Sequence, residues 1–250
     1  MQNYKISLRI KTLAKLTPCC NCFADIGTDH GYLPLTLLEN YKVKKAILCD
    51  INAGPLTNAK KTLSATAYLD NVSFRLGSGL RPILENEAEV ICIAGMGGGL
   101  IKDILEEDLL KAKQANCLIL QPQTEQSELR VWLIKNHFTI QFDYFMNEDD
   151  KYYEIIVIRN IKNSALKAPM AIELPYKDLE FGTKILEENV QDYIHFLAYK
   201  KEKYQKVINA VQNKSHLTEK LKKSQHKISH INQLLSWSED IRRRNNDYIG

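Results

Sequence analysis

A short apolar run followed by a glycine turn, FADIGTDHGYL at residues 23–33, sets the strongest limit on the fold of this chain. The pattern predicts a strand with Asp25 near its end, a turn that holds Gly27 and Gly31, and a helix that begins near Tyr32. Glycines at such a turn let backbone amides approach a ligand at the helix N-terminus. We therefore expect a site for a nucleoside-type cofactor here, and an ordinary strand-to-helix turn is the alternative.

The turn lacks the residues that bind phosphates in other proteins. A P-loop needs Gly-Lys-Ser/Thr after its glycines, and a dinucleotide fingerprint needs G-x-G-x-x-G. Neither pattern is present, and Asp29 stands where a second glycine would let a pyrophosphate approach. Together Asp25 and Asp29 give the turn a negative field that repels phosphates and favours a cation. S-adenosylmethionine, a sulfonium that carries an adenosine group, fits that description.

A further acidic residue supports the same ligand. The apolar run at 45–49, KAILC, is followed by Asp50, 25 residues after Asp25. A carboxylate at about this spacing meets ribose hydroxyls in nucleotide-binding sheets. Asp50 is therefore predicted to bind the ribose of the cofactor.

Apolar strand-like runs alternate with helical patterns through the first half of the chain. Strands are predicted at 22–26, 45–50, 72–76, 90–94 and 117–120, with one helix over 4–16 and others that begin near Tyr32, Pro55, Leu100 and Glu125. This alternation predicts an α/β fold, with a parallel sheet, helices on both faces and a ligand crevice at the carboxyl ends of the strands. Two β-rich runs, 139–145 and 152–159, predict a hairpin that closes the sheet.

The residues just past each strand are the candidates for lining the crevice. They are Gly27, Thr28, Asp29, His30, Gly31 and Tyr32 after the first strand, Asp50 and Ile51 after the second, Gly77, Ser78, Gly79 and Leu80 after the third, Ala94, Gly95, Met96, Gly97 and Gly98 after the fourth, and Gln121 and Gln123 after the fifth. Small residues in the third and fourth groups let a flat base or another ligand lie against the main chain. For residues 97–99 the alternative is helix packing.

The C-terminal part has a different periodicity and charge. Apolar positions recur at spacings of three and four in two series, 186–211 and 217–235, which predicts an antiparallel pair of helices, with one continuous helix as the alternative. Residues 181–250 hold 13 Lys and Arg against 8 Asp and Glu, whereas the first 180 residues hold 21 against 22. This positive excess favours a polyanionic partner, and a solvated helix face explains it equally well.

Composition excludes several classes of protein. The 250 residues are 44% hydrophobic, which excludes wholesale disorder. No apolar stretch approaches the roughly 20 residues that span a bilayer, so we expect a cytoplasmic protein with no membrane association. Cys19 and Cys22 have the spacing of metal ligands, but the sequence holds no second such pair, so no metal site is expected.

Three segments together resemble one enzyme family. ADIGTDHGYLP at 24–34, IAGMGG at 93–98 and LILQPQ at 118–123 are similar to bacterial tRNA methyltransferases that modify N1 of adenine at tRNA position 22, the TrmK family. The likeness covers nearly the whole chain, including LEFG at 179–182 before the C-terminal helices. Gly31 departs from the alanine expected there, which puts nothing serious in doubt.

The resemblance implies a fold and a partner. The expected architecture is a seven-stranded Rossmann-like S-adenosylmethionine-dependent methyltransferase domain over 1–160, a connector over 161–180 and a C-terminal antiparallel coiled coil over 181–250. S-adenosylmethionine is the implied cofactor and tRNA the implied partner. A monomer is expected, although the sequence leaves open whether the coiled coil binds RNA or pairs two protomers.

The resemblance also implies roles for the candidate residues. Asp50 would hold the ribose, Gly27 and Gly31 would admit the methionine portion, residues 77–80 would flank the adenine, and residues 94–97 would face the donor methyl group and the incoming base. Substrate contacts would come from Arg9, Gly97, Gly98, Gln121 and Gln123, with Arg9 in a basic segment that meets phosphates. Adenine N1 has a lone pair, so direct attack on the methyl group is feasible and catalysis is mostly positioning.

Two catalytic assignments have structural alternatives. Asp29 is the candidate catalytic carboxylate, and capping the following helix is its alternative role. His30 could be a base, and an ordinary hydrogen-bonded histidine is the alternative.

Other functions remain open at this point. The chain could methylate another RNA position, a protein or a small molecule, or it could be a non-catalytic RNA-binding protein with a vestigial pocket. Asp50 and the glycine turns argue against the vestigial pocket. The lack of an Asn/Asp-Pro-Pro-Tyr element after the fourth strand argues against methylation of an exocyclic amine.

Overall fold

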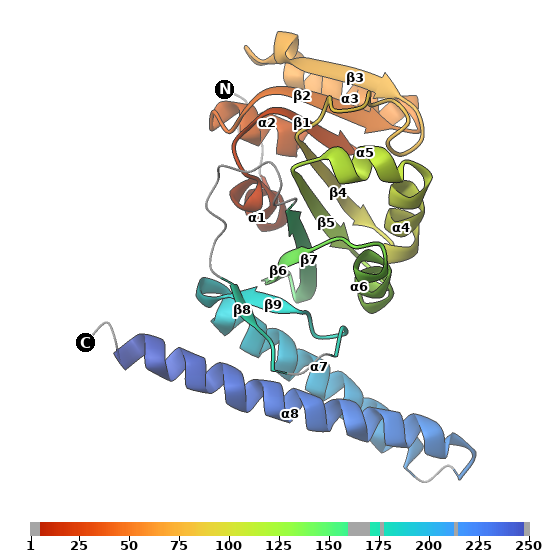
Figure 1. The fold of residues 1–250 in the computed structure, drawn as a ribbon, viewed down its shortest axis with the longest axis vertical. Helices are drawn as coiled ribbons and strands as arrows, with labels where there is room; N and C mark the ends of the chain where they lie inside the picture. Colours follow the sequence, from red (N-terminus) through yellow and green to blue (C-terminus); the bar gives the residue numbers. More distant parts are fainter. Residues whose placement is uncertain (1–5, 160–170, 176–177, 213–214, 248–250) are drawn as a thin grey trace. The chain divides into compact units, whose positions relative to one another are not determined.

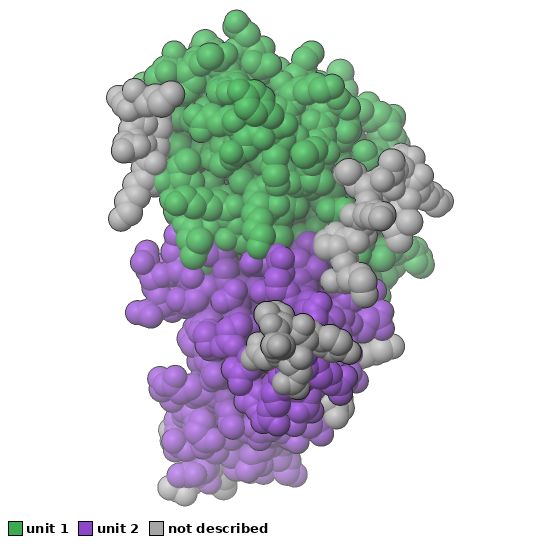
Figure 2. All heavy atoms as spheres, turned by 90° about the vertical axis from the view of Figure 1, so that its left-hand side faces the viewer, with its two compact units in different colours: residues 1–141, 153–168 green, residues 142–152, 169–250 purple. Residues whose placement is uncertain are grey.

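The structure is a computed structural model that describes residues 6–159, 171–175, 178–212 and 215–247 (Figure 1). Internal contacts divide the chain into two compact units, coloured separately in Figure 2. Unit 1 comprises residues 1–141 and 153–168, and unit 2 comprises residues 142–152 and 169–250. The predicted domain boundaries at 160 and 181 stay a prediction, and much of the predicted connector, at 160–170 and 176–177, lies outside the described residues.

Unit 1 contains a mostly parallel sheet with strand order β3-β2-β1-β4-β5-β7. The strands are β1 (Cys20–Ile26), β2 (Val43–Asp50), β3 (Val72–Leu76), β4 (Val90–Met96), β5 (Cys117–Pro122) and β7 (Lys151–Arg159). The first five pair in parallel, and β7 runs antiparallel to β5. The predicted α/β class is therefore confirmed. The central strands β4 and β5 are buried along their apolar runs, as expected for a sheet covered on both faces.

Six helices lie among the described residues of this unit. They are α1 (Leu8–Leu16), α2 (Tyr32–Glu39), α3 (Ala53–Ser64), α4 (Gly98–Glu107), α5 (Leu109–Gln114) and α6 (Gln126–Lys135), with a short 3-10 turn η1 (Leu69–Asn71) before β3. The predicted helix over 4–16 begins later than expected, because Ser7 caps it: the Ser7 hydroxyl accepts a hydrogen bond from the Ile10 amide at 3.2 Å. Residues 1–5 lie outside the described part.

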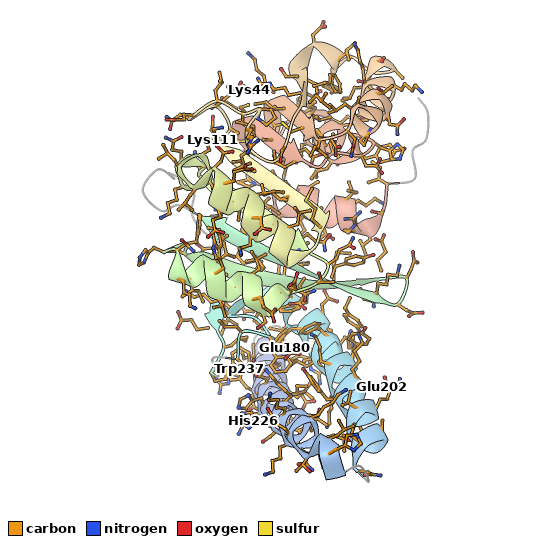
Figure 3. All side chains as sticks on the ribbon, turned by 90° about the vertical axis from the view of Figure 1, so that its right-hand side faces the viewer. Lys44, Lys111, Glu180, Glu202, His226 and Trp237 are labelled. Atoms are coloured by element: carbon orange, nitrogen blue, oxygen red, sulfur yellow. The ribbon has the colours of Figure 1, made fainter. Side chains whose placement is uncertain are left out.

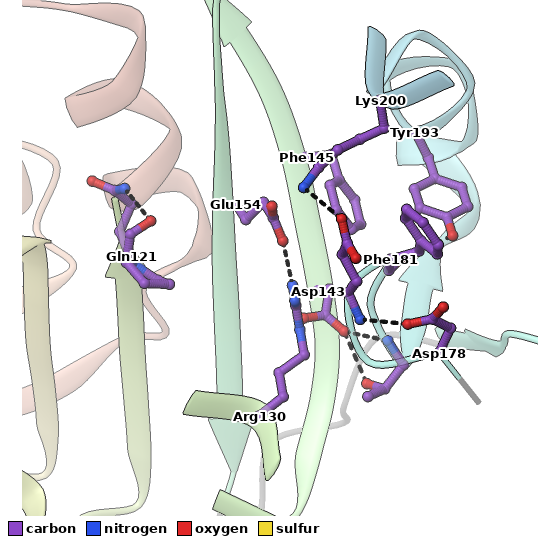
Figure 4. Close-up of polar contacts among 12 residues, drawn as sticks. Gln121, Arg130, Asp143, Phe145, Glu154, Asp178, Phe181, Tyr193 and Lys200 are labelled. Atoms are coloured by element: carbon purple, nitrogen blue, oxygen red, sulfur yellow. Dashed lines mark hydrogen bonds and ion pairs between the residues drawn. The ribbon is translucent and has the colours of Figure 1, made fainter. Parts of the chain in front are cut away.

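A buried ion pair fixes α6 to β7. Arg130 NH2 donates to Glu154 Oε2 at 2.7 Å, and the two side chains are 0% and 4% exposed (Figure 4). The buried positive charge of Arg130 is thus paired with the negative charge of Glu154, as burial of a charge requires.

Unit 2 combines a small sheet with two long helices. Its strands are β6 (Ile140–Glu148), β8 (Ala171–Glu173) and β9 (Lys184–Leu186), in the order β6-β9-β8. A 3-10 turn η3 (Glu187–Asn189) leads into α7 (Val190–Val211), and η4 (Ser215–Leu217) leads into α8 (Thr218–Asp247). The core of this unit combines aliphatic side chains with the aromatic side chains of Phe145, Phe181, Tyr193 and Phe196.

Helices α7 and α8 lie side by side and run antiparallel (Figure 1). Near the start of α7, Gln191 Oε1 accepts a hydrogen bond from Arg242 of α8 at 3.2 Å. At the other end, Tyr204 and Val207 share a groove with Leu217 and Lys220. The predicted antiparallel pair is therefore confirmed, and the alternative of one continuous helix is wrong.

The strand count differs from the prediction. Nine strands occur among the described residues, against the seven expected. The two unexpected strands, β8 and β9, are three residues each, too short to show a period of two in the sequence. In the same described part of the chain, no helix is both long and apolar enough to cross a bilayer.

Candidate functional site

The carboxyl ends of β1, β2 and β3 are joined by backbone hydrogen bonds. The amides of Gly27 and Thr28 donate to the Cys49 carbonyl at 2.8 and 3.1 Å, and the Gly77 amide donates to the Asp50 carbonyl at 2.9 Å. Three turns predicted to line the crevice therefore lie at one edge of the sheet.

Gly27 also brings the end of β4 to this edge. Its φ is +76°, in the left-handed region, and a Cβ there would lie 2.0 Å from Met96 Cε. The positive φ favours glycine at this position, and any side chain there would also have to displace the tip of the Met96 side chain. Met96, a predicted cofactor residue, thus lies over the glycine turn.

Asp25 is a buried carboxyl group, 9% exposed near the carboxyl end of β1. Burial raises its pKa to about 6; the Thr28 hydroxyl and the Arg9 charge lower it, and the Asp50 charge raises it further. The Thr28 hydroxyl is close enough to affect this pKa, yet among the described residues its buried oxygen makes no hydrogen bond of normal geometry. Burial therefore opposes the ionisation of this carboxyl more strongly than the nearby Arg9 charge favours it.

Asp50 is held at the end of β2 by its own turn. Its Oδ1 accepts a hydrogen bond from the Asn52 amide at 2.7 Å, which fixes the carboxylate at the first residue past the buried part of the strand. Ile51 beside it is 66% exposed. This position leaves the carboxylate at the edge where Gly27 and Gly77 meet.

Asp29 and His30 form an exposed pair beyond the turn. His30 Nε2 lies 3.4 Å from Asp29 Oδ2, and their side chains are 47% and 73% exposed. The His30 ring stacks on Tyr32, with centroids 5.4 Å apart and 17° between planes. The N-cap of α2 is Gly31, without a side-chain hydrogen bond, so the alternative role of Asp29 as a helix cap is wrong.

The turn after β3, residues 77–80, presents backbone atoms rather than side chains to a ligand. A Cβ on Gly77 would lie 2.6 Å from Pro82 Cγ, and the Leu80 side chain is fully buried. Lys111 of α5, labelled in Figure 3, donates to the Leu80 carbonyl at 3.1 Å and pairs with Asp108 at 3.0 Å. The turn is thereby held against α5. Gly79 packs against Ile104, whereas Ser78 lines a small acidic groove beside α4.

The fourth and fifth strands bring a further group of predicted residues together. Gln121 Oε1 accepts hydrogen bonds from the Gly95 amide and from Arg9 NH1, both at 3.1 Å. Gly95 has φ +81°, and a Cβ there would lie 3.4 Å from Arg9 NH1 and 3.8 Å from Gln123 Nε2. Arg9 also lies over the Tyr153 ring, 5.8 Å from its centroid, a contact for which the sequence gives no signal.

Two of the glycines after β4 have a packing role. The Gly98 amide donates to the Thr124 carbonyl at 2.8 Å, and a Cβ on Gly98 would lie 2.5 Å from the Glu125 carbonyl oxygen. The Gly99 amide donates to Glu125 Oε2 at 3.1 Å. Helix packing therefore accounts for these two residues, while Gly97 is the N-cap of α4. Substrate binding by Gly97 and Gly98 stays a prediction.

These features fit a cationic nucleoside such as S-adenosylmethionine. The Thr28 hydroxyl offers a buried polar atom that a ligand can satisfy. Asp25 and Asp50 supply negative charge, which suits a sulfonium and hydroxyl groups and repels phosphates. The glycine turns admit a flat ligand close to the backbone.

Comparison with known proteins agrees with this geometry. The family model described as tRNA (adenine(22)-N(1))-methyltransferase, TrmK, matches residues 23–233. The tRNA (adenine(22)-N(1))-methyltransferase of Bacillus subtilis (strain 168) is 39% identical over 157 residues, which are 63% of this chain and 66% of that protein. The chain thus spans somewhat under two thirds of that relative in the match.

Two solved structures with ligands extend the comparison to most of the chain. Streptococcus pneumoniae Sp1610 in complex with S-adenosyl-L-methionine is 32% identical, with a TM-score of 0.75 over 92% of this chain and 99% of that chain. M. capricolum TrmK in complex with S-adenosyl-homocysteine is 28% identical, with a TM-score of 0.72 over 92% of this chain and 98% of that chain.

Proposed function

Since this chain belongs to the TrmK family of tRNA (adenine(22)-N(1))-methyltransferases, we propose that it methylates N1 of adenine 22 in the D-loop of tRNA with S-adenosylmethionine. The observation that carries this proposal is the meeting of acidic residues and glycine turns at the carboxyl ends of β1 to β4, in the part of the chain that matches the family. Two relatives of similar fold hold S-adenosyl-L-methionine and S-adenosyl-homocysteine. A vestigial pocket does not account for a turn that still holds Asp25, Gly27 and Asp50 at one edge of the sheet.

The cofactor side of the crevice is formed by the first three turns. Asp50 binds the ribose hydroxyls, since its carboxylate is already oriented by the Asn52 amide. Gly27 to Tyr32 surround the methionine portion, and residues 77–80 flank the adenine with backbone. Asp25 supplies the negative field that favours the sulfonium. When bound, S-adenosylmethionine supplies an electrophilic methyl group.

The substrate side is formed by residues that follow β4 and β5. Residues 94–97 face the reacting atoms, and Arg9, Gln121 and Gln123 border them. The N1 lone pair attacks the methyl group in line, the carbon–sulfur bond breaks, and the cationic adenine later loses a proton from its exocyclic amine. The protein holds the two reactants in line, which lowers the barrier through proximity. Asp29 stabilises the positive charge that develops on the base.

The target base must leave the folded tRNA to reach the crevice. Arg9 and the basic C-terminal helices supply contacts to the phosphates. We infer that the reaction takes place in the cytoplasm, because that is where the tRNA substrate is found. We also propose that the enzyme acts as a monomer, which sedimentation at assay concentrations tests directly.

One experiment tests the proposed function. Purified protein is incubated with labelled S-adenosylmethionine and unmodified tRNA, and the labelled nucleoside is identified and mapped. A matched tRNA with guanine at position 22 is the control. The expected result is 1-methyladenosine at position 22 and no label in the control. Label at another position, or in protein instead of RNA, would contradict the proposal.

A further inference from the structure

We infer that Gln121 is a positioning residue, whose buried side-chain amide holds Arg9 of α1 and the backbone of Gly95 at the substrate side of the crevice. In this arrangement Arg9 receives a phosphate of the target nucleotide, and Gln121 does not touch the base. The inference rests on the proposed function for the identity of the substrate.

The hydrogen bonds of Gln121 leave its carbonyl oxygen no room for a ligand. Its side chain is 0% exposed, and Oε1 accepts from both Arg9 NH1 and the Gly95 amide at 3.1 Å. Because both neighbours are donors only, the oxygen must face them, which fixes the orientation of the amide. On the other side, Nε2 donates to the Pro122 carbonyl at 3.1 Å (Figure 4). A side chain used in this way cannot accept a hydrogen bond from an adenine edge.

Arg9 is the group that this amide orients. Its guanidinium is a planar fork of five donors, and such a fork matches a phosphate. The Tyr153 ring faces the guanidinium of Arg9. Because Gly95 has no side chain, the guanidinium can approach the backbone of Gly95. The positive charge of Arg9 also lowers the pKa of Asp25. Arg9 therefore brings a cation to a crevice whose other charged groups repel RNA phosphates.

The contact also couples α1 to the end of the sheet. Arg9 and Gln121 are 112 residues apart in sequence. The far end of α1 is held separately, because Lys42 Nζ donates to the carbonyls of Ala14, Lys15 and Thr17 at 2.8, 2.9 and 2.7 Å. Loss of the Gln121 contact should therefore free the Arg9 end of α1 and leave its other end in place.

Steady-state methylation of tRNA by single and double variants tests this assignment. Gln121→Met and Arg9→Met should each raise the KM for tRNA about tenfold, as expected for the loss of one charged contact, and leave kcat and the Kd for S-adenosylmethionine within about twofold. Because both variants remove the same contact, the KM for tRNA of the double variant should also rise about tenfold rather than a hundredfold. Lys11→Met, which removes an exposed charge from the same helix, is the matched control.

A conservative variant and a second measurement separate positioning from other roles. Gln121→Glu keeps the acceptor oxygen for Arg9 and Gly95 and, with its second oxygen protonated, a donor for the Pro122 carbonyl, so it should restore the KM to within about threefold of wild type. Hydrogen exchange at the first turns of α1 should be faster in Gln121→Met and in Arg9→Met, and unchanged in Gln121→Glu. This measurement needs no tRNA, so it tests the contact even if the proposed substrate is wrong.

Two results would overturn the inference. A KM for tRNA in the double variant that rises by the product of the two single effects would show that the two residues act independently. A fall in kcat with an unchanged KM in Gln121→Met would show that Gln121 acts on the base itself.

Discussion

The acidic side chains of the two units have opposite surroundings. In the crevice of unit 1, Asp25 is buried and its pKa is raised to about 6, mainly by burial. In unit 2, Asp178 and Glu180 are also partly buried, but hydrogen bonds from α7 and α8 outweigh the effect of burial and lower both pKa values.

The unit 2 cluster is a dense set of charge-assisted contacts. Lys227 Nζ lies 2.9 and 2.8 Å from the Asp178 carboxylate oxygens and 3.0 Å from Glu180 Oε2. His230 Nδ1 lies 3.1 Å from Asp178, and the Tyr204 hydroxyl donates to Glu180, which is labelled in Figure 3. These contacts tie the segment before β9 to both long helices.

We infer that Asp178 and Glu180 stabilise the fold, whereas Asp25 is available to bind a ligand. Carboxylates that are paired in the folded chain add to its stability, whereas a buried carboxyl without a cationic partner lowers it. The crevice therefore carries a cost in stability that a cationic cofactor offsets on binding. Four variants test this contrast, in order of expected effect.

Removing the cation of the unit 2 cluster should have the largest effect. Lys227→Met leaves two partly buried carboxylates without their shared partner, which should lower the free energy of unfolding by about 3 kcal/mol. Urea unfolding followed by circular dichroism measures this change in the free energy of unfolding. Lys223→Met is the control, because the Lys223–Glu219 pair is exposed to solvent and its loss should leave the midpoint unchanged. Equal midpoints for the two variants would show that the cluster is not structural.

Asp50→Ala should weaken the binding of S-adenosylmethionine about ten- to a hundredfold, since a charge-assisted contact to hydroxyls contributes about 1.5–3 kcal/mol. Isothermal titration calorimetry gives the Kd. Asp70→Ala, at an exposed position before β3, is the control. An unchanged Kd for Asp50→Ala would remove this residue from the cofactor site.

Asp25→Asn should stabilise the ligand-free protein by about 2 kcal/mol above pH 6, because it removes a buried charge. The raised pKa means that the folded state takes up a proton more readily than the unfolded state between pH 4 and 6. Wild type should therefore lose stability relative to Asp25→Asn as the pH rises through that window, with no difference below it. Thermal unfolding from pH 3.5 to 7.5 measures this difference. A constant difference over the whole range would contradict the assignment.

The unit 2 cluster should respond to pH in the opposite direction. Asp178 and Glu180 have lowered pKa values, so their stabilising contribution is present above about pH 4 and is lost as the pH falls further. Lys227→Met should remove much of that acid dependence.

Asp29→Asn should have the smallest effect. The side chain is 73% exposed and caps no helix, so stability should not change. Single-turnover methylation at saturating cofactor should slow about fivefold, because the carboxylate acts only as positive charge develops on the base. An unchanged rate would leave Asp29 without a catalytic role.

The sequence predicted the elements that carry strong periodic patterns. Strands β1 to β5 and the start of α2 at Tyr32 agree with the predicted positions to within a few residues, because apolar runs and glycine turns are local signals. The predicted starts near Pro55 and Leu100 were each two residues late, since α3 begins at Ala53 and α4 at Gly98.

The sequence could not predict features that depend on distant contacts. The last strand predicted from the sequence is 152–159, and the structure adds β9 at Lys184–Leu186, just before the C-terminal helices. Asp143 of β6 accepts hydrogen bonds from Thr183 at 2.6 and 2.9 Å, and Asn189 exchanges hydrogen bonds with the Phe145 backbone at 2.8 and 2.9 Å. A chain cut at 179 would lose these partners, so point variants are better tests of the C-terminal helices than truncation.

The same limit applies to the site. Strand ends predicted which turns line the crevice, because parallel strands share a carboxyl edge. The hydrogen bond between Arg9 and Gln121 depends on how α1 packs at the end of the sheet, and no local sequence pattern predicts it. The packing role of Gly98 likewise depends on the backbone of residues 124 and 125, which only the folded chain brings near.

The most direct test of the contrast compares two ligands that differ in charge. S-adenosylmethionine carries a sulfonium, whereas S-adenosyl-homocysteine lacks the transferred methyl group and has a neutral sulfur. Calorimetric titration of both ligands at pH 7.5, with wild type and Asp25→Asn, gives the ratio of the two affinities in each protein. If the crevice carboxyl is kept for a cation, Asp25→Asn should shift that ratio about tenfold against S-adenosylmethionine. An equal change for both ligands, or none, would contradict the account.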